Sequence, residues 1–191
     1  MASGEFSLIK KFFLSPTYKK DVVVGVGDDC AIVSVPGDRQ LAITTDTLVE
    51  GVHFPAGSSP DDIACKAVAV NLSDLAAMGA EPVWLTLALT LPNEDESWLS
   101  AFSDSFRHSA EKFDVQLIGG DTTQGPLAMT IQAMGLVEPG RIMRRDAARP
   151  GDAIYVSGTL GDAAAGLEII EQQRAMNENH SWLLNRLNCP E

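Results

Sequence analysis

The most apolar stretch of the chain runs from Val83 to Leu91 and is nine residues long. A membrane-spanning helix needs roughly 20 such residues, so this stretch predicts a β-strand inside a globular domain. Helices are expected before and after it. The first begins at Pro60, which is followed by Asp61 and Asp62, and ends at about residue 78 before Gly79. The second opens in the polar residues 93–96 and continues to about residue 113.

The remaining pattern predicts short strands and two more helices. Helical spacing of apolar residues predicts a short helix over 4–14, and another is expected over 161–173. Strands are expected over 22–27, 30–35, 41–45, 115–118, 127–137 and 153–157, with residues 46–59 as a loop. This order mixes hairpins with crossover helices, so the predicted fold class is α+β with a mixed or antiparallel sheet.

A domain boundary is expected near residues 138–150. Residues 1–138 then form the first domain, and 139–191 form a linker and the incomplete start of a second, α/β domain. An apolar cluster made of Trp182, Leu183, Leu184 and Leu187 lies just before the last residue. Such a cluster is typical of a shortened form of a longer protein. Alternatively, this helix packs on the first domain or on a second copy of the chain.

The charge of the chain restricts its ligands. With 14 Lys+Arg against 26 Asp+Glu, the formal net charge is −12. This disfavours binding to nucleic acid and to anionic lipid. An anionic ligand could still bind if a metal cation lies between it and the protein. Residues 1–14 lack the apolar core of a signal peptide, so we expect a cytoplasmic protein with no membrane partner.

Four acidic positions stand out as candidate metal ligands: Asp29 (beside Asp28), Asp46, Asp74 and Asp121. Each taken singly could be a turn former or a helix cap. Asp74 is the one charge between Ala67 and Ala80. Holding an ionised carboxylate on an apolar helix face costs several kcal/mol, roughly, unless a cation compensates. Lys66 and metal ions are the candidate compensators.

The neighbouring residues favour a hard cation. Carboxylate and hydroxyl oxygens, as in Thr44, Thr45 and Asp46, suit Mg²⁺. Glycines 119 and 120 would let backbone N–H groups approach phosphate oxygens beside the carboxylate of Asp121. Converging carboxylates repel each other by about 4 kcal/mol per pair at 4 Å. We therefore expect the four aspartates to meet around two or more divalent ions. A P-loop motif is absent from the sequence.

Two further features leave alternatives open. His53 follows the segment of Asp46 and is either a substrate contact or a residue that packs its own loop. Four arginines are concentrated between residues 141 and 149. They form either a solvated loop that balances nearby acids or, for at least one of them, a contact to nucleotide phosphate.

Four motifs together resemble the thiamine-monophosphate kinase family. They are GVGDDCA (Gly25–Ala31), TTDTLVEGVHF (Thr44–Phe54), KAVAVNLSDLAAMGA (Lys66–Ala80) and IGGDTTQGP (Ile118–Pro126). The resemblance runs in order over roughly residues 1–170. The family is ATP-dependent and shares a superfamily with aminoimidazole ribonucleotide synthetase and selenophosphate synthetase.

The resemblance implies that the first domain has the N-terminal fold of the aminoimidazole ribonucleotide synthetase superfamily and is joined to a C-terminal α/β domain. It also implies a homodimer formed through N-terminal strands that complete a barrel. It implies transfer of the γ-phosphoryl group of ATP to thiamine monophosphate, with Asp46 and Asp121 as catalytic residues. His53 matches a substrate contact, and Gly120, Asp121 and Arg145 match nucleotide contacts. The implied Mg²⁺ ligands are Asp29, Thr44, Thr45, Asp46, Asp74 and Asp121.

The resemblance also implies what this chain lacks, because the family's second domain carries a further metal and ATP motif and an acidic substrate segment. Two competing hypotheses therefore stay open. One is a superfamily relative that acts on another acceptor, and the other is a non-catalytic fragment that dimerises and binds metal or nucleotide. A phosphate-monoester acceptor, with a second pKa of about 6, needs no general base at pH 7. An aspartate-rich site that neutralises two anions would suit such a reaction.

Overall fold

The computed structural model describes residues 5–14, 16, 18–172 and 178–190. The chain divides into two compact units, Met1–Met143 and Arg144–Glu191. The helices and strands in chain order are α1 (Glu5–Leu8), the π-helix η1 (Ile9–Phe13), β1 (Val22–Val24), β2 (Ile32–Val33), β3 (Gln40–Val49), α2 (Pro60–Ala77), β4 (Glu81–Leu91), α3 (Glu96–Lys112), β5 (Gln116–Gln124), β6 (Ala128–Val137), α4 (Asp162–Glu171) and α5 (Glu178–Asn188).

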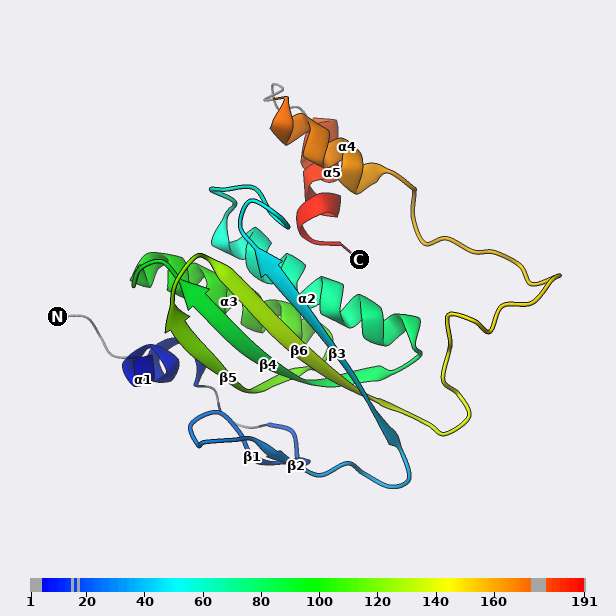
Figure 1. Cartoon of the computed structure of the whole chain (residues 1–191), viewed down its shortest axis with the longest axis horizontal. Coiled ribbons are helices and arrows are strands. Elements are labelled where there is room, and N and C mark those ends of the chain that lie inside the picture. The colour runs from blue at the N-terminus through cyan, green and yellow to red at the C-terminus, as the bar shows by residue number, and fades with distance from the viewer. Residues whose placement is uncertain (1–4, 15, 17, 173–177, 191) are drawn as a thin grey trace. The chain divides into compact units, whose positions relative to one another are not determined.

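A four-stranded mixed sheet forms the centre of the first unit, with the strand order β3-β6-β4-β5 (Figure 1). Strands β4 and β5 pair in parallel, and β6 pairs antiparallel with both β3 and β4. Helix α2 connects β3 to β4, and α3 connects β4 to β5. Crossover helices of this kind are what parallel strands require, and the α+β class expected from the sequence is confirmed.

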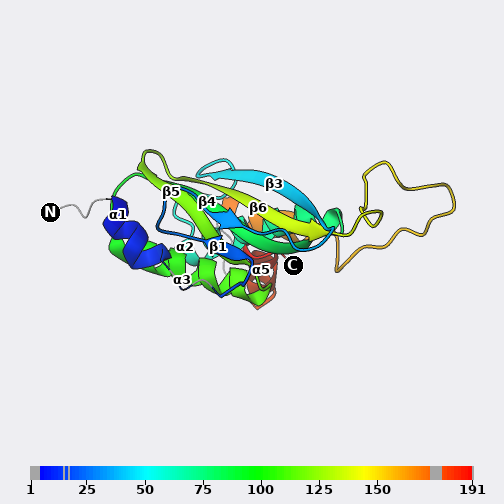
Figure 2. The same cartoon turned by 90° about the horizontal axis from the view of Figure 1, so that it is seen from below.

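Both long helices cover the same face of the sheet (Figure 2). Helix α2 contacts β3, β6 and β4, whereas α3 contacts β5, α2 and η1. Alternate residues of the central strands point into this layer, so Leu85, Leu87 and Leu89 of β4 are buried. They belong to the main core cluster together with Leu72 of α2 and Phe102 of α3. This core positions β3 and β5 at opposite edges of one rigid sheet.

A smaller core lies on the other face of the sheet. Trp84 is fully buried although its neighbour Leu85 points to the helices, and successive strand residues face opposite sides. The cluster consists of Val22, Val83, Trp84, Ile118, Met134 and Leu136. Since Val22 belongs to β1, the β1–β2 hairpin covers this part of the open face. The hairpin thereby carries the segment of Asp28 and Asp29 to the β5 side of the sheet.

Local capping explains where the two long helices begin. The side chain of Ser59 accepts a hydrogen bond from the Asp62 N–H at 3.1 Å, and Pro60 occupies the first helical turn of α2. At α3, Asp95 accepts from the N–H groups of Ser97 and Trp98. The Ser97 hydroxyl also donates to Asp95 at 2.7 Å, and this bond, with those two, lowers the pKa of the Asp95 carboxyl. Both helix starts agree with the sequence expectation.

Several strand expectations were wrong. Strand β3 continues to Val49, so Asp46 lies inside a strand and not in a loop, and β5 continues beyond Gly119-Gly120-Asp121. In each case a neighbouring strand extends the pairing across residues that have turn-like or polar sequences. Residues 153–157 form no strand, and Ile154 is 94% exposed. A strand needs a partner to satisfy its backbone groups, and within the described residues this segment pairs with none.

The first unit ends at residue 143, inside the region 138–150 where a domain boundary was expected. The reason is local, because the N–H of Met143 donates to the carbonyl oxygen of Met78 at 3.1 Å. The Met143 side chain also lies against Gly79, at the end of α2.

In the second unit, α4 packs closely on α5, where Gly166 lies against the backbone of Leu183. None of the helices in the described part of the chain has the length and apolarity to cross a membrane.

The two neighbouring glycines of β5, Gly119 and Gly120, differ in how much space is available for a side chain. A Cβ added to Gly120 would lie 1.9 Å from the carbonyl oxygen of Leu87, on the neighbouring strand. A Cβ added to Gly119 would meet only side-chain atoms, at 3.9 Å or more. Side-chain contacts as close as the first are not observed in proteins, so the β4–β5 pairing requires glycine at position 120.

We therefore expect Gly120→Ala to lower the free energy of unfolding by roughly 2–3 kcal/mol, because the two strands must separate to admit the methyl group. Gly119→Ala is the matched control and should change it by less than about 1 kcal/mol. Urea unfolding followed by circular dichroism measures both. Equal stability of the two variants would contradict the close approach of β4 and β5.

Candidate functional site

Two candidate metal ligands come together at the β3 edge of the sheet. The Thr44 hydroxyl on β3 donates a hydrogen bond of 2.7 Å to a carboxylate oxygen of Asp74 on α2. Asp46 lies two residues further along β3, so its side chain is on the same, helix-facing side of the strand as Thr44. Thr45 points to the opposite face and pairs with Gln132 of β6. This edge therefore presents Thr44, Asp46 and Asp74, without Thr45.

Asn71 ties the helix to this edge. Its side chain is fully buried, accepts a hydrogen bond from the N–H of Asp46 at 3.2 Å, and donates to the carbonyl oxygen of Ala67 at 2.9 Å. Asn71 was not among the expected site residues. The available signal was its position three residues before Asp74, which places both side chains on one helix face. Asn71 thus orients the backbone at Asp46 while Asp74 reaches Thr44.

Asp74 itself differs from expectation. We expected a carboxylate buried on an apolar helix face, but Asp74 is exposed. Water and the Thr44 hydroxyl therefore solvate it, and the desolvation cost assumed from the sequence does not arise. Lys66 does not act as its partner either, because the Lys66 ammonium donates to the carbonyl oxygen of His53 at 3.2 Å.

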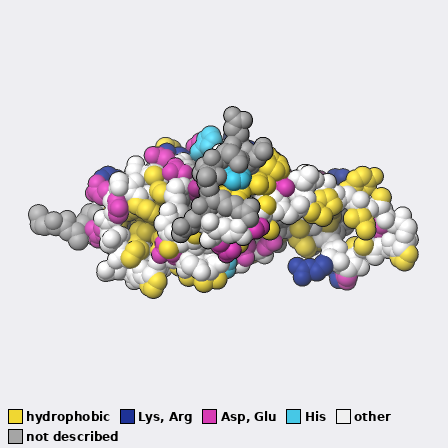
Figure 3. Space-filling model, turned by 90° about the horizontal axis from the view of Figure 1, so that it is seen from above, with side chains coloured by type: hydrophobic (Ala, Val, Ile, Leu, Met, Phe, Trp, Pro, Cys, Tyr) yellow, Lys and Arg dark blue, Asp and Glu magenta, His cyan; other side chains and the backbone are white. Residues whose placement is uncertain are grey.

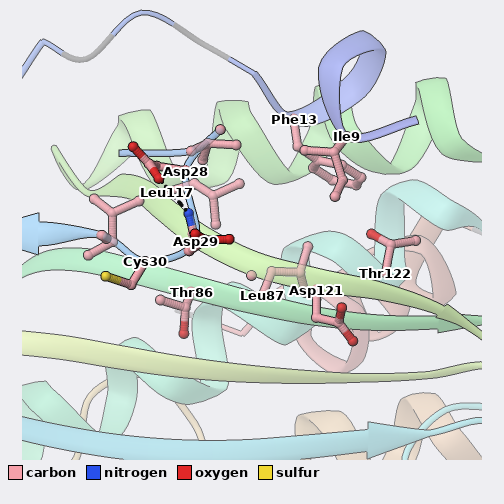
Figure 4. A pocket seen from close by; sticks show the side chains of 16 residues that line it. Ile9, Phe13, Asp28, Asp29, Cys30, Thr86, Leu87, Leu117, Asp121 and Thr122 are labelled. Atoms are coloured by element: carbon pink, nitrogen blue, oxygen red, sulfur yellow. Dashed lines mark hydrogen bonds between the residues drawn. The ribbon is translucent and has the colours of Figure 1, made fainter. Parts of the chain in front are cut away.

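The second group of candidate residues lines a pocket of about 720 Å³ at the β5 edge (Figure 4). Gly119, Gly120 and Asp121 of β5 form one wall, and the segment before β2 contributes Asp28 and Asp29. An Asp28 carboxylate oxygen accepts the Asp29 N–H at 2.9 Å. This bond occupies part of the Asp28 carboxylate within its own turn and leaves the Asp29 side chain for a ligand.

The sheet keeps these two groups apart within one chain. In the register of the sheet, Asp46 of β3 pairs with Ile131 of β6, and Ile131 pairs with Leu87 of β4. Leu87 in turn pairs with Gly120 of β5. Three strand spacings of about 4.8 Å separate the two edges by roughly 14 Å. Asp121 pairs with the exposed Ala88, so its side chain also points to the face opposite that of Asp46.

The expected meeting of four aspartates therefore does not occur within one chain. Among the described residues, no group of three or more His, Cys, Asp or Glu side chains is placed to hold a metal ion. Within one chain the order of the strands keeps the four aspartates in two groups. The strand order β3-β6-β4-β5 places Asp46 at one edge of the sheet and Asp121, with Asp29 beside it, at the other.

The residues at the β3 edge nevertheless fit Mg²⁺. The Thr44 hydroxyl and the Asp74 carboxylate place two oxygen atoms 2.7 Å apart. Adjacent oxygens in an octahedron with bonds of 2.0–2.1 Å are separated by about 2.9 Å. Hydroxyl and carboxylate oxygens are also the donors that this cation prefers. At the β5 edge the available donors, Asp29 and Asp121, are carboxylates as well.

His53 lies in the turn that follows β3. Its Nδ1 accepts a hydrogen bond from the N–H of Val49 at 3.0 Å, and its own N–H donates to the carbonyl oxygen of Val49 at 2.9 Å. An imidazole that accepts at Nδ1 carries its proton at Nε2 when neutral. The exposed ring therefore presents an Nε2–H donor to the solvent. Both expected roles are compatible with this geometry, since the ring packs its own turn and offers a donor.

The arginine segment shows two local ion pairs. Arg141 lies 3.2 Å from Glu138, and Arg144 makes two bonds of 2.9 Å to Asp146. These two arginines match the solvated-loop interpretation. Arg145 belongs to the second unit and is exposed, so its contact to a nucleotide stays a prediction.

Acidic side chains are scattered over the face of the molecule shown in Figure 3, with few basic ones between them. The chain as a whole carries 26 acidic and 14 basic residues. A polyphosphate that approaches either edge of the sheet meets carboxylates there. Binding of such an anion consequently depends on a metal cation or on backbone N–H donors.

The chain resembles known proteins over most of its length. The family model of the AIR synthase related protein, N-terminal domain, matches residues 27–137. The thiamine-monophosphate kinase of Salmonella typhimurium is 55% identical over 179 residues, and that of Escherichia coli K12 is 57% identical over 189 residues. These alignments cover 93% and 97% of the chain.

Two solved structures are similar to the chain over most of its length. The crystal structure of thiamine-monophosphate kinase from Stenotrophomonas maltophilia K279a has a TM-score of 0.84 and 48% identity, over 90% of this chain and 56% of that one. AaThiL complexed with AMPPCP and TMP has a TM-score of 0.76 and 32% identity, over 90% and 54%. The chain spans a little more than half the length of the curated relatives it matches, namely 55% and 58% of the first two.

The role of Asn71 gives a first prediction for this site. We expect Asn71→Leu to lower the free energy of unfolding by about 1–3 kcal/mol, because the N–H of Asp46 loses its buried acceptor. Ser73→Ala, an exposed change on the same helix, is the control and should have little effect. Urea unfolding provides the comparison, and hydrogen exchange at Asp46 should be faster in the leucine variant only. Unchanged exchange would refute this role.

Lys66 gives a second prediction, on pH. Burial lowers its pKa below the ordinary 10.5, and the nearby Asp62 opposes this in part. The folded protein therefore releases this proton at lower pH than the unfolded chain does. In the window between the lowered pKa and 10.5, stability then increases with pH.

Lys66→Met removes the titrating group. We therefore expect the free energy of unfolding of the wild type to increase relative to that of the variant as the pH approaches 10.5. Urea titrations between pH 8 and 10.5 measure the difference. Parallel pH curves for the two proteins would count against a pKa shift at Lys66.

Proposed function

The chain belongs to the AIR synthase-related protein family, and from this premise we propose that it forms the ATP- and metal-binding part of a thiamine-monophosphate kinase. The reaction is transfer of the γ-phosphoryl group of ATP to thiamine monophosphate, which gives thiamine diphosphate. The observation that carries the proposal is the donor set at the two sheet edges, which consists of carboxylates, a threonine hydroxyl and a glycine-rich strand. Relatives at 55% and 57% identity bear the name thiamine-monophosphate kinase.

In this proposal the residues have separate tasks. Asp29, Thr44, Thr45, Asp46, Asp74 and Asp121 hold several Mg²⁺ ions, with Asp46 and Asp121 closest to the transferred group. Gly120, Asp121 and Arg145 contact ATP. His53 contacts thiamine monophosphate, and its Nε2–H suits an acceptor oxygen of that substrate. Thr45 would have to contribute through its backbone or from the opposite face, since its side chain points away from Asp46.

The chemistry requires little beyond orientation and charge compensation. The phosphate of the acceptor has a second pKa of about 6, so its attacking oxygen is already deprotonated at pH 7. Bound Mg²⁺ supplies the positive charge that lets two polyanions approach each other. The aspartates and Thr44 hold that charge in place, and the N–H groups of β5 orient phosphate oxygens. Positioning and charge compensation of this kind account for most of the catalysis in phosphoryl transfer.

We further propose that two copies of the chain complete each site. The Asp46 and Asp74 group lies roughly 14 Å from the Asp121 strand in one chain, too far for one metal ion to join them. Strands β3 and β5 are both sheet edges, and Ile43, on the face away from the helices, is 56% exposed. A homodimer through these strands, closing a barrel, would bring the β5 edge of one copy to the β3 edge of its partner.

Two lesser assignments complete the proposal. Residues 1–138 would be the ATP- and metal-binding domain, and 139–191 a linker and the beginning of a C-terminal domain. This assignment is supported by the separate unit that starts at Arg144. Because ATP is the phosphoryl donor, we propose that the protein acts in the cytoplasm.

The dimer and the reaction are tested together by subunit complementation. Asp46→Asn and Asp121→Asn should each lower thiamine diphosphate formation by roughly 100-fold or more while the fold is retained, because each removes charge at the reacting phosphates. A mixture of the two variants, unfolded and refolded together, forms heterodimers with one intact site. We expect about a quarter of the wild-type activity to return.

The control is Asp38→Asn, which changes an exposed carboxylate in the turn before β3, eight residues ahead of Asp46 in the sequence. Unchanged activity of Asp46→Asn would refute its catalytic role. Inactive variants without recovery on mixing would refute the shared site. If this chain binds Mg·ATP but forms no thiamine diphosphate, it is the non-catalytic binding fragment. If it instead phosphorylates another acceptor, it is a superfamily relative that acts on a different substrate.

A further inference from the structure

The turn that carries His53 is shaped by its own hydrogen bonds. It follows β3 and leads toward α2 (Figure 1). Phe54 is buried in the main core, and its carbonyl oxygen accepts the N–H of Gly51 at 2.8 Å. The ring Nδ1 and the N–H of His53 both bond to Val49, at 3.0 and 2.9 Å. These bonds join the backbone of the turn to itself and to the end of β3.

Lys66 joins this turn to helix α2. Its ammonium donates to the carbonyl oxygen of His53 at 3.2 Å, across 13 residues of sequence. A cationic donor makes a stronger hydrogen bond than a neutral donor does. The Lys66 side chain is half-buried, and this burial lowers its pKa. The carbonyl of the residue that is proposed to contact the acceptor is therefore held by a side chain from a different element.

Helix α2 also carries the contacts that order the β3 edge. Asn71 accepts the N–H of Asp46, and Asp74 accepts the hydroxyl of Thr44. Lys66 is eight residues before Asp74 in the same helix, which is about 12 Å along the helix axis. One helix thus sets the distance between the turn after β3 and the proposed metal site. A fixed distance of this kind is what the orientation of a substrate requires.

We infer that Lys66 is a positioning residue for the phosphate acceptor, because it holds the turn of His53 so that the Nε2–H of the ring faces thiamine monophosphate. This inference rests on the proposed function, to which the substrate contact of His53 belongs. The alternative is a direct contact between the Lys66 ammonium and the acceptor phosphate. That ammonium is already bonded to His53, and Asp74 of the proposed metal site lies about 12 Å further along α2. These observations favour action through His53.

A double-mutant cycle tests the inference. Isothermal titration calorimetry of the 191-residue chain with Mg²⁺ measures binding of thiamine monophosphate and of ATP. Lys66→Met should weaken thiamine monophosphate roughly three- to tenfold, as expected for the loss of one hydrogen bond, and should change ATP less than about twofold. His53→Ala should weaken thiamine monophosphate at least as much. The double variant should bind it as His53→Ala does, because Lys66 acts through His53.

Two further variants are the controls. Lys66→Arg keeps a cationic donor at the same position, so we expect it to restore binding of thiamine monophosphate to within about twofold of the wild type. Lys112→Met removes the same charge from an exposed lysine of α3 and should leave both ligands unaffected. Circular dichroism melting establishes that each variant is folded.

Hydrogen exchange followed by NMR gives a readout that needs no ligand. The N–H of Val49 bonds to the ring of His53. In Lys66→Met this amide should exchange faster, because the turn opens more often when its tie to α2 is lost. The N–H of Asp46, which Asn71 holds, should exchange at the same rate in both proteins.

The outcomes distinguish this inference from the proposed function. Unchanged binding of thiamine monophosphate by Lys66→Met, or unchanged exchange at Val49, would overturn the positioning role alone. Additive losses in the double variant would also overturn it and would indicate a direct contact of Lys66 to the substrate. Equal weakening of ATP and thiamine monophosphate would show a general loss of structure and would overturn it too. If the wild-type chain binds neither ligand, the proposed function is overturned, and the role of Lys66 in acceptor binding with it.

Discussion

The order of the four strands decides where every acidic side chain of interest lies. Because β6 and β4 stand between β3 and β5, hydrogen-bonded backbone spacing separates Asp46 from Gly120 by roughly 14 Å. Side-chain rotamers cannot close such a gap, since the sheet is held by a packed core on the helix side and a second cluster under the hairpin. A site that needs both edges therefore cannot form within one sheet, and the proposed second copy would supply the missing edge.

Each edge is organised by a different contact. At β3, the buried amide of Asn71 accepts a hydrogen bond from the backbone of Asp46, and Thr44 bonds Asp74, so two hydrogen bonds link helix α2 to the edge strand. At β5, the backbone of Gly120 lies too close to Leu87 for any side chain. The first arrangement orders side-chain oxygens for a cation, and the second leaves backbone groups open to a phosphate. In the proposed function these two arrangements would bind the metal and the phosphate, respectively.

The exposure of these carboxylates also matters for how the site works. Asp74 and Asp121 are exposed, so water screens their charges and they cost little to maintain without a ligand. A buried cluster of four carboxylates would have required its ions for folding itself. The separation within one chain means that folding of this domain does not require cations at these carboxylates. The strongly acidic composition of the chain is compatible with folding for the same reason.

The sequence by itself determined the elements whose signals are local. Pro60 and Ser59 define the start of α2, Asp95 defines that of α3, and the apolar run 83–91 forms β4. The four motifs also identified the family and the chemistry of the donors. Tertiary structure alone decided the rest. The extension of β3 through Asp46, the unpaired state of residues 153–157 and the division of the aspartates between two edges depend on which strand lies beside which. Strand pairing joins residues far apart in the chain, so no local pattern specifies it.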